Sequence, residues 1–260
     1  MIRTLFFSIG ILITFLSQTA HAQNTRLRDD NAIGWYTYTG TFRVQQKWSL
    51  HTEYQWRRED FGPTWQQSLL RVGLNYQLNP NVLFHLGYGW IETFDYGDYP
   101  INGFGKQFPE HRIYQQVNIS QKTGRVDLLH RYRLEQRWNG RFNTADSNSP
   151  DGWTYLNRLR YMLRLQVPLQ GPTLDDKEFY LAAYDELFIG FGKNVNQNVF
   201  DQNRVGVLAG YRLNKNLKIE AGYLQQIVQL SRRINDRNVF QYNNGLLVNV
   251  IINADLKKGL

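Results

Sequence analysis

The sequence contains no cysteine and only two methionines among its 260 residues. The absence of cysteine excludes a disulfide scaffold, thiolate metal ligands, a cysteine nucleophile and a lipid-modified cysteine anchor. Acidic residues are also scarce, because 22 Asp and Glu stand against 30 Lys and Arg, for a formal net charge of +8. The chain is nevertheless rich in aromatic residues, with 7 Trp, 16 Tyr and 15 Phe, so its composition is not typical of disorder.

Only the N-terminus carries a long apolar run. Arg3 precedes an apolar stretch over residues 5–16, and Ala20-His21-Ala22 fits the small-x-small pattern of a cleavage site. We therefore predict a secretory signal peptide over residues 1–22, cleaved near Ala22, and a single mature domain over residues 23–260. The run is too short for a membrane-spanning helix, which needs about 20 residues. No later run is long enough either, so any further membrane insertion must use strands.

Alternation of apolar and polar residues dominates the mature chain and predicts strands. In residues 48–59, for example, Trp48, Leu50 and Trp56 share one phase. The clearest segments are residues 48–59, 82–90, 125–138, 153–167 and 246–256, and weaker ones are 32–44, 66–78, 110–121, 178–191, 204–213 and 217–230. Strands of about 10–15 residues exceed the usual 5–6 of globular proteins and suit a membrane, which tilted strands cross in about 9–11.

The connections between these strands are of two kinds. Short turns are expected at residues 45–47, 79–81, 122–124 and 214–216, and longer polar loops at 97–108, 140–152, 192–203 and 231–238. The connection over residues 168–177 is longer than the short turns with which it alternates in position, which weakens the pattern. Short periplasmic turns and long outer loops are typical of an outer-membrane barrel. We therefore predict an all-β fold, a single antiparallel up-and-down transmembrane β-barrel. Because bacterial barrels have even strand numbers, with both termini periplasmic, we expect about twelve strands, the extra one from residues 24–31, with ten as the alternative.

The apolar phase is expected to face lipid, with aromatic girdles at the two interfaces. The candidate girdle residues are Trp48, Trp56, Trp90, Tyr96, Trp138, Trp153 and Tyr155. The alternative is a soluble exported β-protein, in which the aromatics would fill a core and the arginines would face water. The strand lengths favour the membrane barrel.

The polar phase is rich in arginine, which suits fixed, bidentate pairing in a confined space. The predicted lumen polar network is Glu53, Arg57, Arg71, Arg131, Arg133, Glu135, Arg137, Arg158, Arg160, Arg164, Arg204, Arg212 and Glu220. Such a network could fill a narrow lumen and hold the barrel rigid without transport. Alternatively, the surplus positive charge could line a narrow water-filled pore that admits small anions. Side chains can fill a barrel of this size, which favours the structural network.

Four segments resemble a known family. They are residues 34–38 (GWYTY), 47–57 (KWSLHTEYQWR), 111–116 (HRIYQQ) and 130–137 (HRYRLEQR). The family is an uncharacterised one, a domain of unknown function, of bacterial outer-membrane β-barrel proteins of the Bacteroidetes type. The resemblance implies a Gram-negative outer membrane, with its lipids and the barrel-assembly machinery as partners, and it brings no activity. The C-terminus departs from the usual ending, because no terminal aromatic closes the last strand.

Catalysis is the main competing function, since some small outer-membrane barrels are lipid-modifying enzymes of the phospholipase or acyltransferase type. A Ser–His mechanism requires the two side chains within hydrogen-bond reach, and the sequence has no His-x-Ser. The histidines of the mature chain are better explained as polar fillers, and no carboxylate cluster has metal-ligand spacing. We therefore expect no catalytic, metal or cofactor-binding residues. Arginines enclosed in an exported barrel also argue against a nucleic-acid partner.

Overall fold

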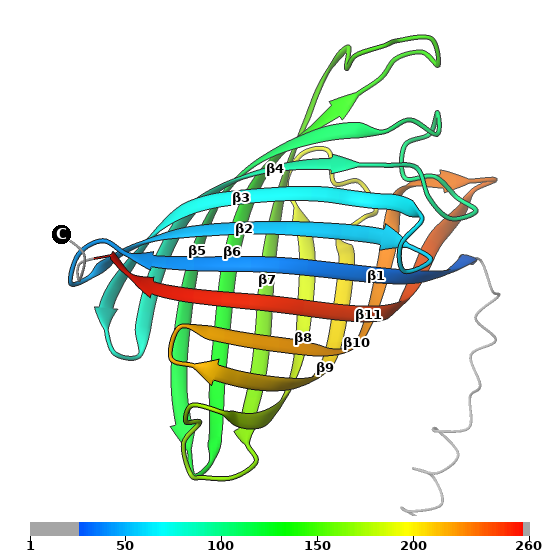
Figure 1. Ribbon diagram of the computed structural model, residues 1–260. Coiled ribbons are helices and arrows are strands. Elements are labelled where there is room, and N and C mark those ends of the chain that lie inside the picture. Colours follow the sequence, from blue (N-terminus) through cyan, green and yellow to red (C-terminus); the bar gives the residue numbers. More distant parts are fainter. Residues whose placement is uncertain (1–25, 257–260) are drawn as a thin grey trace, which may run out of the picture.

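The computed structural model describes residues 26–256, which form one closed barrel of eleven strands (Figure 1). The strands are β1 (Arg26–Arg43), β2 (Trp48–Glu59), β3 (Thr64–Asn79), β4 (Val82–Thr93), β5 (Phe108–Thr123), β6 (Val126–Arg141), β7 (Gly152–Pro168), β8 (Glu178–Phe191), β9 (Phe200–Asn214), β10 (Leu217–Ile234) and β11 (Arg237–Asp255). Within residues 26–256, no helix is long and apolar enough to cross a membrane. The expected signal peptide, residues 1–22, lies outside the described residues.

The all-β up-and-down barrel is confirmed, with eleven strands in the described chain where about twelve were expected. Residues 26–31 extend β1 and do not form a strand of their own. Consecutive strands run antiparallel, so an odd number makes the first and last run in the same direction. β1 and β11 accordingly close the barrel as a parallel pair, from Arg26 opposite Asn238 to Arg43 opposite Asp255. The expectation that both termini lie at the same end is therefore wrong for the described chain, whose two ends lie at opposite ends of the barrel (Figure 1).

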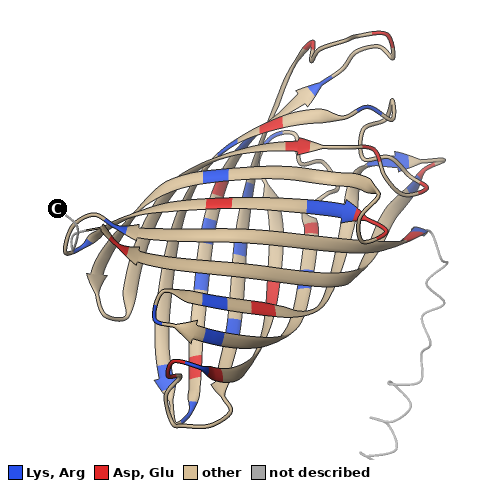
Figure 2. Cartoon of the chain, in the orientation of Figure 1, with Lys and Arg blue, Asp and Glu red and all other residues tan. Residues whose placement is uncertain are grey.

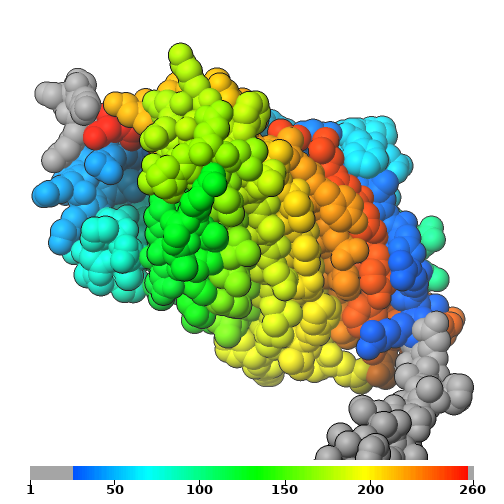
Figure 3. All heavy atoms as spheres, turned by 90° about the horizontal axis from the view of Figure 1, so that it is seen from below, coloured from blue at the N-terminus to red at the C-terminus, as the bar shows by residue number. Residues whose placement is uncertain are grey.

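The outer wall of the barrel is largely apolar, with a few exposed polar residues such as Gln115 and Asp185 in the same phase. Leu86 and Val207 are 57% and 56% exposed, and apolar residues in the same phase are also exposed on every other strand except β1. The wall is closed where β6 to β11 and β1 can be seen side by side from below (Figure 3). The charged residues lie in bands in the middle of the strands as well as at their ends (Figure 2). Among these mid-strand residues, arginines such as Arg71, Arg133 and Arg160 are at most 4% exposed. Apolar side chains therefore dominate the outside of the barrel, and most of the mid-strand arginines and glutamates lie inside.

Of the predicted girdle residues, Trp48, Trp56, Trp90, Trp153 and Tyr155 are exposed on the outer wall, and Trp138 is partly exposed. Tyr96 is the exception, because it lies in the β4–β5 connection and is buried inside the barrel mouth. Tyr96 comes after the end of β4 at Thr93, where the chain leaves the sheet and turns inward. The prediction that Tyr96 belongs to the girdle is therefore wrong.

Tyrosine side chains lie flat against glycines of the neighbouring strand on the inner wall. Tyr180 and Tyr184 on β8 stand directly opposite Gly210 and Gly206 on β9. A Cβ atom at Gly210 would lie 2.2 Å from the ring of Tyr180, and one at Gly206 would lie 2.3 Å from that of Tyr184. Glycine inside a strand marks such a close approach. These pairs allow bulky rings to line the wall without filling the lumen.

The two ends of the barrel differ. The turn end carries the connections 44–47, 80–81, 124–125, 169–177 and 215–216, and the loop end carries 60–63, 94–107, 142–151, 192–199 and 235–236. The prediction of a long loop at residues 231–238 is wrong. β10 continues to Ile234 and β11 begins at Arg237, so only Asn235-Asp236 lie between them. Both residues of this turn have positive φ, the conformation that Asn and Asp tolerate best among non-glycine residues.

The β4–β5 connection, residues 94–107, folds across the loop end of the lumen. Tyr96 donates to Gln241 at 2.8 Å, and the buried Asp29 carboxylate accepts from the backbone of Asp98 and Tyr99. Burial raises the pKa of Tyr96 to about 12, so its hydroxyl stays protonated and able to donate. Arg232 on β10 also donates to the Pro100 carbonyl. This connection is thus bound to β1, β10 and β11 and covers the mouth.

Candidate functional site in the barrel lumen

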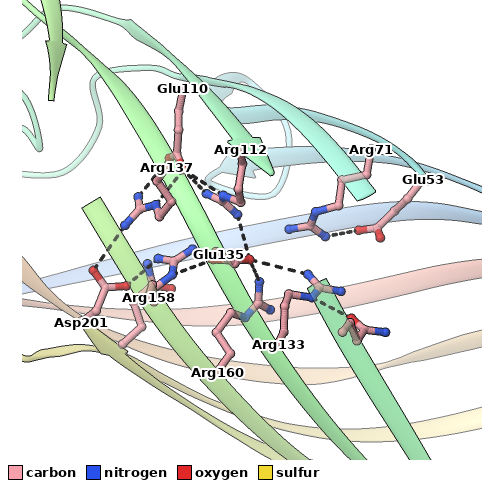
Figure 4. A network of polar contacts seen from close by, with 12 residues as sticks. Glu53, Arg71, Glu110, Arg112, Arg133, Glu135, Arg137, Arg158, Arg160 and Asp201 are labelled. Atoms are coloured by element: carbon pink, nitrogen blue, oxygen red, sulfur yellow. Dashed lines mark hydrogen bonds and ion pairs between the residues drawn. The ribbon is translucent and has the colours of Figure 1, made fainter. Parts of the chain in front are cut away.

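Glu135 lies at the centre of the largest group of ion pairs in the lumen (Figure 4). Its side chain has no exposed surface, and its Oε2 accepts from Arg158 at 2.6 and 2.8 Å, while its Oε1 accepts from Arg160 at 2.7 Å. Arg112 and Arg133 lie 3.5 and 3.7 Å from Oε1. The five residues come from the consecutive strands β5, β6 and β7. One carboxylate therefore binds these three strands together from inside.

Glu110 and Asp201 continue this network toward the loop end. Glu110 accepts from Arg112 at 2.6 and 2.8 Å and from Arg137 at 2.7 and 3.0 Å. Asp201 on β9 accepts from Arg158 at 2.6 Å. Because only β8 lies between β7 and β9 in the sheet, this contact joins two strands that are not directly paired.

Further carboxylates accept from arginines closer to the turn end. The pairs are Glu53 with Arg71 at 2.6 Å, Glu186 with Arg131 at 2.8 Å and with Arg160 at 2.7 Å, and Glu220 with Arg164. Charge-assisted bonds of this kind are short and directional. They are also shielded from water, which strengthens each attraction and makes each unpaired charge costly.

Arg57 and Arg204 differ from the other buried arginines. They are 3% and 8% exposed, yet no ion pair within 4.0 Å in residues 26–256 includes either of them. Arg57 donates to Gln55 and Gln67, and Arg204 donates to Gln202. Both guanidiniums lie against the ring of Trp35, with their Cζ atoms 3.8 and 4.9 Å from its centroid.

Fully buried side chains form a layer inside the lumen around Trp35. The members, none more than 2% exposed, are Ile33, Leu69, Ile91, Glu135, Arg158, Phe188 and Leu224. They come from β1, β3, β4, β6, β7, β8 and β10, so the layer reaches around most of the wall. Solvent does not reach these side chains from either end.

On the turn side of this layer lies a cavity of about 550 Å³. Its walls begin at Trp35, Arg57 and Arg160 and extend to Thr41 and Asn253 near the turn end. Seven arginines and three glutamates line it, so the lining has an excess of four positive charges. The volume is within the range of small-molecule sites, about 300–1,000 Å³.

The structure places twelve of the thirteen predicted lumen residues in this network or around this cavity. Arg212 lies apart, at the turn end, where it contacts Asp176 at 3.0 Å and donates to the Leu174 carbonyl at 2.7 Å. Sequence reasoning missed Glu110, Arg112 and Asp201 as network members. Glu110 and Arg112 share the phase of Gln116 on one strand, which is the signal that could have found them, whereas Asp201 lies in a segment interpreted as loop.

The four histidines of residues 26–256 hydrogen-bond Glu53, Asn75, Tyr88 and Tyr161. Ser120 stands opposite Leu129, one position from His130 on β6, so Ser120 and His130 point to opposite faces of the wall. They therefore cannot form a catalytic pair. Within the same residues, no group of three or more His, Asp or Glu side chains is placed to hold a metal ion.

Comparison with known proteins assigns the chain to a family. Residues 33–238 match the family described as "Protein of unknown function (DUF2490)". The chain belongs to this family. No curated protein matches it. Among solved structures, the NanC porin is similar with 12% sequence identity and a TM-score of 0.43, over 79% of this chain and 91% of the porin chain. The DUF2490 match agrees with the resemblance to an uncharacterised family.

Proposed function

We propose that the protein is an integral β-barrel of the bacterial outer membrane whose lumen is a structural core and not an open pore. Its apolar outer wall would contact membrane lipids, and the barrel-assembly machinery would insert it. The single observation that carries the structural role is the layer of buried side chains around Glu135, because no water contacts side chains without exposed surface.

The location is supported by the distribution of side chains. A membrane-spanning sheet must satisfy its backbone internally, and closure of the barrel does this. Lipid also requires apolar side chains on the outside of the barrel, and Leu86 and Val207 are exposed there. A water-soluble barrel would instead bury its apolar side chains. In a soluble protein this exterior would be an exposed apolar surface of the kind that promotes aggregation.

The structural role is supported by the network itself. Glu135 with its four arginines spans β5 to β7, and Asp201 extends the contacts to β9. Removing one partner from such a buried group would leave uncompensated charge, so the members depend on one another. A network of this kind rigidifies the wall and fixes its register.

Two measurements test the proposal. Cell fractionation should recover the protein in the outer membrane, with a folded form that migrates differently from the heated form on a gel. Purified protein in planar bilayers should give no stepwise conductance under conditions in which a general porin does. Recovery in the soluble periplasm would overturn the location, and stable conductance steps would overturn the closed lumen in favour of a narrow pore.

A further inference from the structure

We propose that the turn-side cavity is a binding site for a small molecule that carries a phosphate or carboxylate group. Arg57 and Arg204 would pair with the anion, and Trp35 would support the two guanidiniums. The inference deepens the proposed function by giving the closed lumen a ligand, and it rests on that function only for the membrane setting. The site itself rests on three independent observations.

The first observation is the charge balance of the cavity wall. Its three glutamates, Glu53, Glu186 and Glu220, are already bound to Arg71, Arg131, Arg160 and Arg164. Arg57 and Arg204 therefore remain buried without a carboxylate partner. Burying a charge is costly unless it is paired, and guanidinium does not escape the cost by losing its proton. A bound anion removes this cost.

The second observation is a set of buried nitrogen atoms without an acceptor. They are Nε of Arg71, Nε of Arg131, Nη1 of Arg133 and Nε of Arg204, and all four side chains line the cavity. Arg71, Arg133 and Arg204 are each more than nine-tenths buried. Buried donors almost always have acceptors in native structures, so each unpaired one calls for an explanation. An oxyanion has several acceptor lone pairs and can serve more than one of them.

The third observation is the form of the cavity floor. Arg204 lies between two rings, with its Cζ atom 4.9 Å from the centroid of Trp35 and 4.5 Å from that of Phe188. The Cζ atom of Arg57 lies 3.8 Å from the centroid of the Trp35 ring. Stacking on a ring holds the plane of a guanidinium and leaves its edge for hydrogen bonds, which is the geometry of bidentate oxyanion recognition. At Arg57 this edge donates to the neutral amides of Gln55 and Gln67, and at Arg204 the Nε atom has no acceptor.

The cavity also defines the access route and the size of the ligand. Its lining continues to Thr41, Asn118 and Asn253, close to the turn end, and at its other end the fully buried Phe188 lies against Arg160 and Arg204. With about 550 Å³, it has room for an anionic head group and a small polar body. The threonines of β1, Thr37, Thr39 and Thr41, supply hydroxyls along this route.

Binding can be measured on the full chain refolded in detergent micelles, by calorimetric titration with inorganic phosphate, glycerol 3-phosphate and uncharged glycerol. We expect both phosphates to bind and glycerol not to bind. Arg57→Gln and Arg204→Gln should each weaken phosphate binding at least tenfold. Arg233→Gln removes the same charge from an exposed residue at the loop end and should leave binding unchanged.

The outcomes separate the sources of the anion and the two proposals. Equal affinity for the two phosphates supports an inorganic ligand, and a preference for glycerol 3-phosphate supports a phosphorylated small molecule. Absence of binding by both, or equal binding by the wild type and the two cavity variants, would overturn the site. Since the titration needs no membrane, its failure would leave the fractionation and conductance results intact. A gel-mobility shift in each variant confirms that the barrel has folded.

Discussion

Glu135→Gln is the substitution that tests the lumen network most strongly. The variant keeps the shape of the side chain and removes the charge that Arg112, Arg133, Arg158 and Arg160 share. Unit charges about 4 Å apart attract with about 4 kcal/mol at an effective dielectric constant of about 20. The net loss is smaller than the sum of four such terms, because Arg158 keeps Asp201 and Arg160 keeps Glu186. We therefore expect a loss of about 3–5 kcal/mol in the free energy of unfolding, the usual cost of breaking a buried pair.

The assay is reversible urea unfolding in lipid vesicles, followed by tryptophan fluorescence and by heat-modifiable gel mobility. The matched control is Asp127→Asn, which removes the carboxylate that lies 3.8 Å from Lys122 in a pair with both side chains about 40% exposed. Exposed pairs contribute less than about 1 kcal/mol, so the control should unfold almost like the wild type. If Glu135→Gln were as stable as Asp127→Asn, the network would not hold the barrel together.

Three further predictions concern the wall and the loop end. Gly210→Ala should destabilise the barrel by about 1–3 kcal/mol in the same urea assay, because its Cβ would meet the Tyr180 ring at 2.2 Å, whereas Gly89→Ala, with its nearest neighbour at 3.4 Å, should be tolerated. Gly97→Ala should release the β4–β5 connection, because φ at Gly97 is +72° and the new Cβ atom would lie 2.6 Å from Asp29. An added protease should then cleave this connection faster, whereas Gly103→Ala should leave the cleavage rate unchanged. Tyr114→Phe should keep or slightly raise the stability, because the buried hydroxyl has no partner, and a loss of more than about 1 kcal/mol would show that a bond to it had been missed.

Alternation predicted the strands well where one face meets lipid and the other meets the polar lumen. The predicted bounds 48–59 and 178–191 coincide with β2 and β8. Alternation fails at the start of β11, where Val239, Phe240 and Gln241 are consecutive and all buried. Val239 packs with Tyr99 and Ile101 of the β4–β5 connection, so this part of the strand is covered by another segment and does not follow the lipid–lumen pattern.

The partners within the lumen could not be predicted from the sequence. Arg131 and Glu186 are 55 residues apart, and Arg158 and Asp201 are 43 apart. Which charges meet depends on the register around the whole barrel, and the parallel β1–β11 closure contributes to setting it. Trp35 illustrates the same limit, because nothing in the sequence indicates that its indole, which is 4% exposed, contacts two arginines inside the lumen.

Lipid contact of the outer wall is the central claim, and the cysteine-free sequence allows it to be tested by single-cysteine labelling without background. Leu86→Cys, on the outer wall, and Thr39→Cys, in the cavity lining, would each carry an environment-sensitive fluorophore in vesicles of brominated phosphatidylcholine. We expect strong quenching at position 86 and little at position 39. Quenching at position 39 with none at position 86 would contradict the account.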